Sequence, residues 1–177
     1  MIIINFYPES DKTEYIEAAN EYTEIWNKEG HKIFDEIERI SGLKFKTKII
    51  NAVTFKGHSH SLPLRLDCSY SYTHKKASLI HELCHRLTLD NGFYIFDYKN
   101  LNEDIHKITD LILYDIWITI LGEKAAEESR EVEIKYGDPV YKSAWDWALA
   151  LTYEERQSKF KELTQKYSNY KKPKKNL

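Results

Sequence analysis

The chain of 177 residues has few cysteines, glycines and prolines and no long hydrophobic run. Its two cysteines, Cys68 and Cys84, are too few for a disulfide framework. No stretch approaches the roughly 18 apolar residues of a membrane helix, and residues 1–8 lack the basic start and apolar core of a signal peptide. These absences predict a cytoplasmic protein with no membrane partner.

An excess of charge of one sign is also missing, because 26 lysines and arginines face 28 aspartates and glutamates and the formal net charge is -2. Proteins that bind nucleic acids usually concentrate basic residues on one face. The basic run in the tail at 171–177 is short, and we expect it to be a solvated, disordered terminus. We therefore expect no nucleic acid as the main ligand.

What the chain does have fits one globular domain over residues 1–170. Hydrophobic residues make up 42% of the sequence, and four Trp, thirteen Tyr and seven Phe supply enough area for a core. Short β-prone segments alternate with longer helical ones. This order predicts the α+β class, with a small sheet and a remainder that is mostly helical. Nothing in the pattern indicates an oligomeric state.

The first expected elements are a short strand at residues 2–7 and a long helix, capped by Ser10 or Asp11 and ended by Ser41-Gly42. Gly30 is expected to interrupt this helix. Residues 44–55 are β-prone and predict a second strand.

A third strand is expected at residues 62–70, where Leu62, Leu64 and Leu66 alternate with polar residues or proline. Pro63 has no N–H to give to a central ladder, so this strand should lie at the edge of the sheet. An exposed edge can take up an extended peptide as an extra strand. An equally good interpretation is a strand that only completes the sheet.

Residues 81–85 read His-Glu-Leu-Cys-His, an HExxH motif. Apolar residues recur at helical spacing on both sides of it, with Thr73 as the expected N-cap and Asp90-Asn91-Gly92 as the expected end. Two histidines four positions apart lie on one face of a helix, where both imidazoles can bind one Zn2+ ion. The motif therefore predicts zinc ligands at His81 and His85, with Cys84 a small buried apolar residue.

Glu82 would supply the chemistry of this motif. A carboxylate there can take a proton from a zinc-bound water, whose pKa the metal lowers to about 7, and the hydroxide then attacks a polarised carbonyl. We therefore predict that Glu82 is the general base in hydrolysis of a peptide or protein substrate. The alternative is a non-catalytic interaction module in which the zinc is structural.

A catalytic zinc needs a third protein ligand and one open position. The candidates lie on a second predicted helix that continues to Gly122 and is otherwise apolar nearly all round, hence buried. Glu103, His106 and Asp110 fall within about 60° of one another on it. His106 is the favoured ligand, with Asp110 one turn on to orient it. Glu103 is the alternative, and Asp110 itself or Glu127 stays open.

The pair of helices resembles the zincin metallopeptidases, and their spacing is similar to that of the thermolysin-like gluzincins. In those enzymes the second helix carries an Asn-Glu pair with an Asp one turn later. Asn102-Glu103 matches the pair, but Lys107 stands one turn beyond Glu103, whereas Asp110 stands one turn beyond His106. In size the chain also resembles the small intracellular zincins of bacteria and their mobile elements, and this resemblance implies a small mixed sheet packed with helices. The resemblance covers residues 62–122 and implies a zincin-like fold and zinc-dependent endopeptidase activity.

The rest of the chain is interpreted as support: a charged helix at 123–136, a second helix after Asp138-Pro139, and a third opened by a capping box at Thr152 and Glu155. Its aromatic residues are expected to pack rather than bind. A donor for the oxyanion of the hydrolysis intermediate is also required. The sequence leaves four candidates open for that donor, namely Tyr114, His58, His60 and Tyr72.

Overall fold

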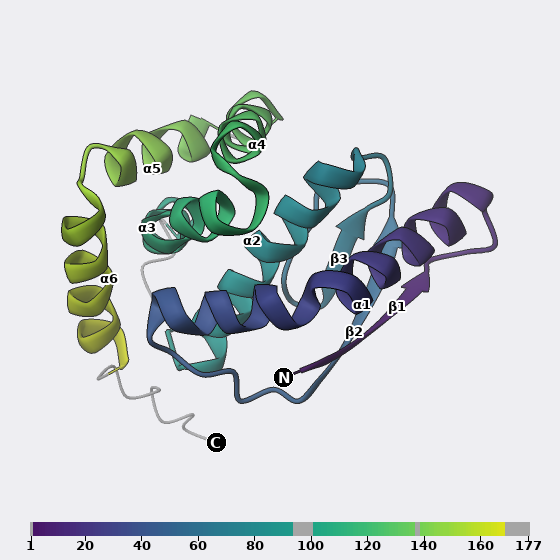
Figure 1. Ribbon diagram of the computed structural model, residues 1–177, viewed down its shortest axis with the longest axis horizontal. Coiled ribbons are helices and arrows are strands. Elements are labelled where there is room, and N and C mark those ends of the chain that lie inside the picture. Colours follow the sequence, from purple (N-terminus) through teal and green to yellow (C-terminus); the bar gives the residue numbers. More distant parts are fainter. Residues whose placement is uncertain (1, 94–100, 137–138, 169–177) are drawn as a thin grey trace, which may run out of the picture.

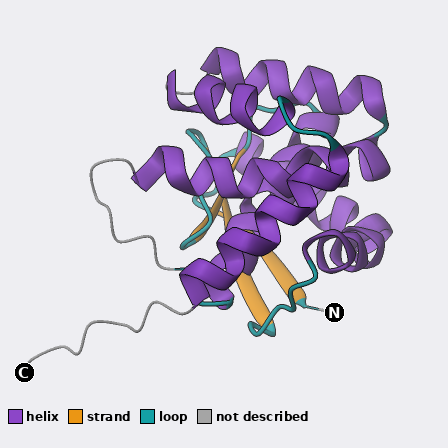
Figure 2. Cartoon of the chain, turned by 90° about the vertical axis from the view of Figure 1, so that its left-hand side faces the viewer, coloured by secondary structure: helices purple, strands orange, loops and turns teal. Residues whose placement is uncertain are grey.

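The computed structural model describes residues 2–93, 101–136 and 139–168. Most of this part is helical, with a small group of strands (Figures 1 and 2), which confirms the α+β class. None of the described helices is long and apolar enough to cross a membrane. The expected tail at 171–177 lies outside the described residues. The elements in chain order are β1 (Ile3–Pro8), α1 (Thr13–Ser41), β2 (Ile49–Phe55), β3 (Leu64–Asp67), α2 (Tyr72–Asp90), α3 (Leu101–Leu121), α4 (Glu123–Tyr136), α5 (Pro139–Leu149) and α6 (Tyr153–Ser168).

The sheet has the order β1-β2-β3, and both neighbouring pairs are parallel. The prediction of a mixed sheet is therefore wrong. The reason is that α1 carries the chain back to the start of β2, so that β1 and β2 run in the same direction. Within the described residues, antiparallel pairing outside the strands is limited to one bridge between His60 and Arg65.

β3 lies at an edge of the sheet, as expected, but it is shorter than predicted and begins after Pro63. Leu64 and Leu66 are buried, which confirms the alternation. The connection from β2 runs back along the outer side of β3. There His60 and Arg65 exchange backbone hydrogen bonds of 3.0 and 2.9 Å. The protein's own chain therefore occupies the edge at Arg65, where a peptide strand was expected to add.

β2 begins at Ile49 and not at Lys44, because the preceding backbone is bound elsewhere. The N–H groups of Lys46 and Thr47 donate to the carboxylate of Asp90 at 3.0 and 2.8 Å. Asp90 is the last residue of α2, so these bonds tie the end of that helix to the entrance of the sheet.

α1 runs without a break through Gly30, so the expected interruption is wrong. Gly30 is buried, and a Cβ at this position would lie 2.7 Å from a ring atom of Trp26. The glycine therefore makes room for a neighbouring aromatic ring within the helix. The end of α1 is as predicted: Gly42 is its C-cap, with a φ of 68° that suits glycine.

Two expected helix caps are displaced. The N-cap of α1 is Lys12, which makes no side-chain cap bond, instead of Ser10 or Asp11. The N-cap of α2 is Ser71 rather than Thr73, and its hydroxyl accepts the N–H three residues later at 3.3 Å. The stop after Asp90 and the bounds of α4 are as predicted.

The C-terminal capping box forms as predicted. The N–H of Thr152 donates to the Glu155 carboxylate at 2.8 Å, and the N–H of Glu155 donates to the Thr152 hydroxyl at 3.3 Å. These two bonds fix the start of α6.

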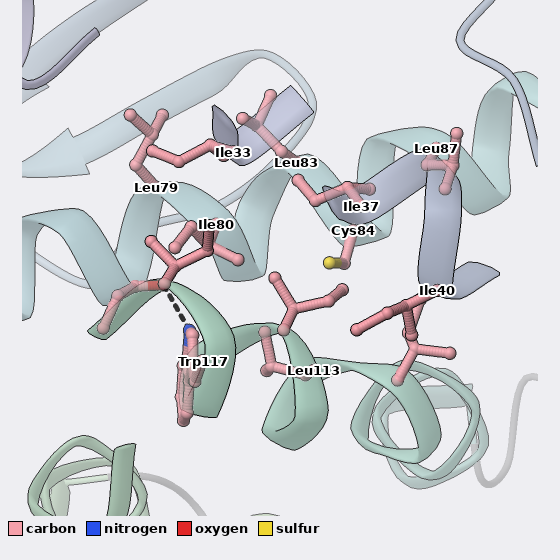
Figure 3. Packing of buried hydrophobic residues seen from close by; sticks show 14 of the residues in the cluster. Ile33, Ile37, Ile40, Leu79, Ile80, Leu83, Cys84, Leu87, Leu113 and Trp117 are labelled. Atoms are coloured by element: carbon pink, nitrogen blue, oxygen red, sulfur yellow. Dashed lines mark hydrogen bonds between the residues drawn. The ribbon is translucent and has the colours of Figure 1, made fainter. Parts of the chain in front are cut away.

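The core forms where α1, α2 and α3 pack together (Figure 3). Cys84 lies among these apolar side chains with no exposed surface, and burial raises the pKa of its thiol, as expected for a core residue. Trp117 of α3 is fully buried and donates its indole N–H to the carbonyl of Ala77 in α2 at 3.1 Å. One buried cluster thus joins the two helices that carry the expected zinc ligands.

We expect Ile37→Ala in α1 to lower the free energy of unfolding by about 2–5 kcal/mol, because the residue is fully buried and the change leaves a cavity. Ile16 is the matched control, since it lies on the same helix and is 41% exposed. Ile16→Ala should change stability by less than about 0.5 kcal/mol. Urea unfolding of both variants measures the difference, and equal losses would contradict the packing described.

Candidate metal centre

Three buried histidines meet where α2 packs against α3. His81, His85 and His106 each offer one ring nitrogen, and these three atoms lie within 4.8 Å of one another. The Nε2 atoms of His81 and His85 are 2.7 Å apart. The ring of His106 is centred 5.5 Å from that of His81 and 5.0 Å from that of His85. The fold thus brings together the two motif histidines and the favoured third candidate.

Two of the carboxylates left open as third ligands, Glu103 and Glu127, lie outside the cluster of ligand atoms. Glu103 pairs with Lys107 at 2.6 Å and accepts the hydroxyl of Ser143 at 3.0 Å. Glu127 pairs with Arg130 and accepts a hydrogen bond from Tyr114. Both carboxylates are therefore engaged away from the histidines.

The outer nitrogens of the two motif histidines are held by the protein. Nδ1 of His81 donates to a carboxylate oxygen of Glu133 in α4, and the other oxygen of Glu133 accepts the indole N–H of Trp145 at 3.1 Å. Nδ1 of His85 is hydrogen-bonded to the hydroxyl of Thr109 at 3.0 Å. Because each Nδ1 is engaged in this way, both Nε2 atoms face the same point.

The ionisation of these histidines differs. Burial, together with His81 and His106, holds the pKa of His85 well below its usual value, so that its ring is neutral as a metal ligand must be. Burial also lowers the pKa of His81, but the nearby carboxylates, Glu133 first, outweigh it and raise this pKa to about 9. The carboxylates that raise the pKa of His81 would also attract a cation bound between the histidines.

Asp110 does not orient His106 as expected, because neither oxygen of its fully buried carboxylate has a hydrogen-bond partner among the described residues. Burial and the charge of Glu133 raise the pKa of Asp110, and His81 opposes this shift. A buried carboxylate without a partner is costly. A divalent ion on the three imidazoles would stabilise its charge, and three imidazoles are a donor set that zinc accepts. The residues present therefore fit a zinc ion.

Glu82 lies in the wall between two cavities. The larger, of about 270 Å³, is lined by His85, His106 and Glu82, and the smaller, of about 50 Å³, by His81 and Glu82. Burial raises the pKa of Glu82 to about 7. Its carboxylate makes no hydrogen bond within the described part of the chain, so it is free to act on a molecule in either cavity.

The larger cavity is lined by both apolar and polar residues, here called its apolar wall and its polar wall. The apolar wall consists of Leu89, Phe93, Ile105 and Ile108. The polar wall includes the segment 59–61, which precedes β3 and whose middle residue forms the bridge to that strand. A bound molecule in this cavity would therefore meet His85, His106 and Glu82 as well as these apolar groups.

The candidate oxyanion donors separate in the structure. Tyr114 is bonded to Glu127 and, like Tyr72, lines neither cavity. His60 lines the larger cavity and His58 the smaller. Tyr141 of α5, which was expected only to pack, lines both, and its ring is centred 4.2 Å from that of His106.

Four residues at this site were not singled out from the sequence: Thr109, Glu133, Tyr141 and Trp145. Thr109 could have been found, because it is a polar residue on the same stripe of an apolar helix as His106. Glu133 could not, because α4 is charged over most of its length and nothing distinguishes one of its glutamates from another. Its role follows only from how α4 docks on α2.

Comparisons with protein-family models, with curated proteins and with solved structures give no match for this chain. The case for a metal centre therefore depends on the motif and on the geometry of the three histidines.

We expect the purified protein to bind one Zn2+, and His106→Ala to weaken that binding by more than 100-fold, because one of three ligands is lost. Glu103→Gln, on the same helix, should leave the zinc affinity unchanged, since Glu103 pairs with Lys107. Competition with a chromophoric chelator measures both affinities. The opposite order of effects would make Glu103 the ligand.

Proposed function

We propose that this protein is a zinc-dependent peptidase, an endopeptidase in which Glu82 is the general base. The observation that supports this most is the position of Glu82, whose unpaired carboxylate lines the cavity beside three clustered histidines. A carboxylate held at a cavity wall beside a metal site is the arrangement that metal-assisted hydrolysis needs. A purely structural zinc has no use for an acceptor left open in this way.

His81, His85 and His106 would hold the ion. Bound zinc lowers the pKa of water to about 7 and polarises a carbonyl group. Glu82 would accept the proton of the attacking water and return it to the leaving amine. Glu133 and Thr109 keep the rings of His81 and His85 in place while this happens.

The substrate would enter through the larger cavity. Because His60 occupies the edge of β3 at Arg65, a peptide would lie along the segment 59–61 instead of along β3 itself. Leu89, Phe93, Ile105 and Ile108 would then surround one of its side chains. This wall favours an apolar residue next to the cleaved bond.

The competing function is a non-catalytic module in which zinc supports a surface for a partner protein. Both functions require zinc binding, so metal content alone does not separate them. If the protein with one bound zinc melted cooperatively, lost stability on chelation and cleaved nothing in a broad peptide library, the structural role would be the correct one.

We expect Glu82→Gln to lower kcat by at least 10²- to 10⁴-fold, because the amide keeps the size of the side chain but cannot accept the proton. The zinc affinity should stay near that of the wild type, since Glu82 is not a ligand in the histidine cluster. Turnover of an accepted peptide and chelator competition are measured on the same preparation. Unchanged turnover would refute the assignment of Glu82 as the base.

We expect Leu89→Lys to change the substrate preference, because it puts a charge into the apolar wall of the cavity. Peptides with Leu or Phe beside the cleaved bond should lose roughly 10- to 200-fold in kcat/KM relative to peptides with Glu there. Ile118→Lys is the control, since Ile118 is 37% exposed on α3 and lines neither cavity. Identical preferences in both variants would place the apolar side chain of the substrate elsewhere.

A further inference from the structure

We propose that Glu133 and Trp145 form a positioning relay that fixes His81 for metal binding, an inference that rests on the proposed zinc site. Glu133 lies in α4 and Trp145 in α5, outside the two helices that supply the ligands. Neither residue belongs to the cluster of potential ligand atoms. Their effect on the ion would therefore pass through His81.

The relay begins at the imidazole of His81. An imidazole has two nitrogens, and the one that carries the proton cannot bind a metal. Because Glu133 accepts a hydrogen bond from Nδ1, the proton is kept on that atom and Nε2 is left to face His85 and His106. A carboxylate behind a ligating histidine also raises the basicity of the ring.

Trp145 fixes the carboxylate in turn. It is fully buried, and its indole N–H donates to the second oxygen of Glu133 at 3.1 Å. With one oxygen held by the indole and the other by His81, the carboxylate of Glu133 cannot rotate without breaking a hydrogen bond. The indole therefore determines where Glu133 can hold His81.

The contacts of the relay lead back to α2, the helix that carries His81. Trp145 stacks on Trp117 of α3 at 5.5 Å between ring centres, and Trp117 donates to the carbonyl of Ala77. Ala77 lies one turn before His81 in α2. Four helices, α2, α4, α5 and α3, are thus joined in one ring of contacts that includes His81. This explains why two tryptophans are stacked directly behind the histidines.

Zinc affinity of four proteins tests the relay: wild type, Glu133→Ala, Trp145→Phe and the double variant. Glu133→Ala should weaken zinc binding by roughly 10- to 100-fold. Trp145→Phe keeps an aromatic ring for Trp117 but removes the indole donor, so its loss should be smaller. In the Glu133→Ala background, Trp145→Phe should cost no more than about a further twofold, because its action passes through the carboxylate. Independent losses that multiply would overturn the relay.

Matched controls come from the same helices. Glu131 is an exposed glutamate of α4, and Trp147 is a partly buried tryptophan of α5 with no hydrogen bond to the site. Glu131→Ala and Trp147→Phe should bind zinc as the wild type does. Should Glu133→Ala fail to fold, Glu133→Gln serves instead, because it keeps the size and one acceptor oxygen. Its zinc affinity is expected to be lower than that of the wild type. An affinity equal to that of the wild type would then count against the relay.

A second readout reports the ring directly. In ¹⁵N-detected NMR of the zinc-loaded protein, His81 should carry a slowly exchanging proton on Nδ1 in the wild type, and Glu133→Ala should make this proton exchange faster with solvent because its acceptor is lost. A role confined to stability would lower the melting temperature and leave both the proton and the affinity unchanged. If wild-type protein bound no zinc, the proposed function itself would fail. If it bound zinc and Glu133→Ala bound it equally well, only the relay would fail.

Discussion

The packing of α2 against α3 is the constraint on which the rest of this structure depends. His81 and His85 can meet His106 only while these two helices lie side by side, and apolar residues hold them there (Figure 3). Cys84 lies within the motif, but its side chain is buried in this helix contact. A small side chain at this position lets α3 approach closely, so the motif contributes ligands on one face of the helix and the helix contact on another.

This close contact brings charged groups into an apolar interior. Glu82 and Asp110 are buried beside the histidines. Burial raises the pKa of both carboxyl groups, Glu133 adds to this rise and His81 opposes it. Burying carboxylates close together is unfavourable unless positive charge is near. A divalent cation at the three imidazoles, as proposed above, would supply that positive charge. The same interior without an ion would contain a carboxylate with no hydrogen-bond partner.

The sequence-based predictions that succeeded were based on the spacing of residues along single helices. The stripe of His106 and Asp110 on an apolar helix correctly identified a polar position in the core, and the three histidines do cluster. The predictions that failed depend on contacts that residue spacing does not show. Gly30 was expected to interrupt α1. The spacing of residues along the chain does not show that this glycine makes room for the ring of Trp26. The edge of β3 was expected to be open, whereas the chain before it folds back to His60. Glu133 depends on the docking of α4, which no local pattern specifies.

The distribution of the proposed metal site over the chain would link metal binding to folding. Two of the imidazoles come from α2 and one from α3, but the hydrogen bonds that orient His81 come from α4 and α5, which follow both in the sequence. An ion that binds only the assembled site stabilises every contact needed to assemble it. The docking of α4 and α5 would therefore be coupled to the orientation of His81. The C-terminal helices, which the sequence presents as plain support, would in this way contribute to the proposed metal site.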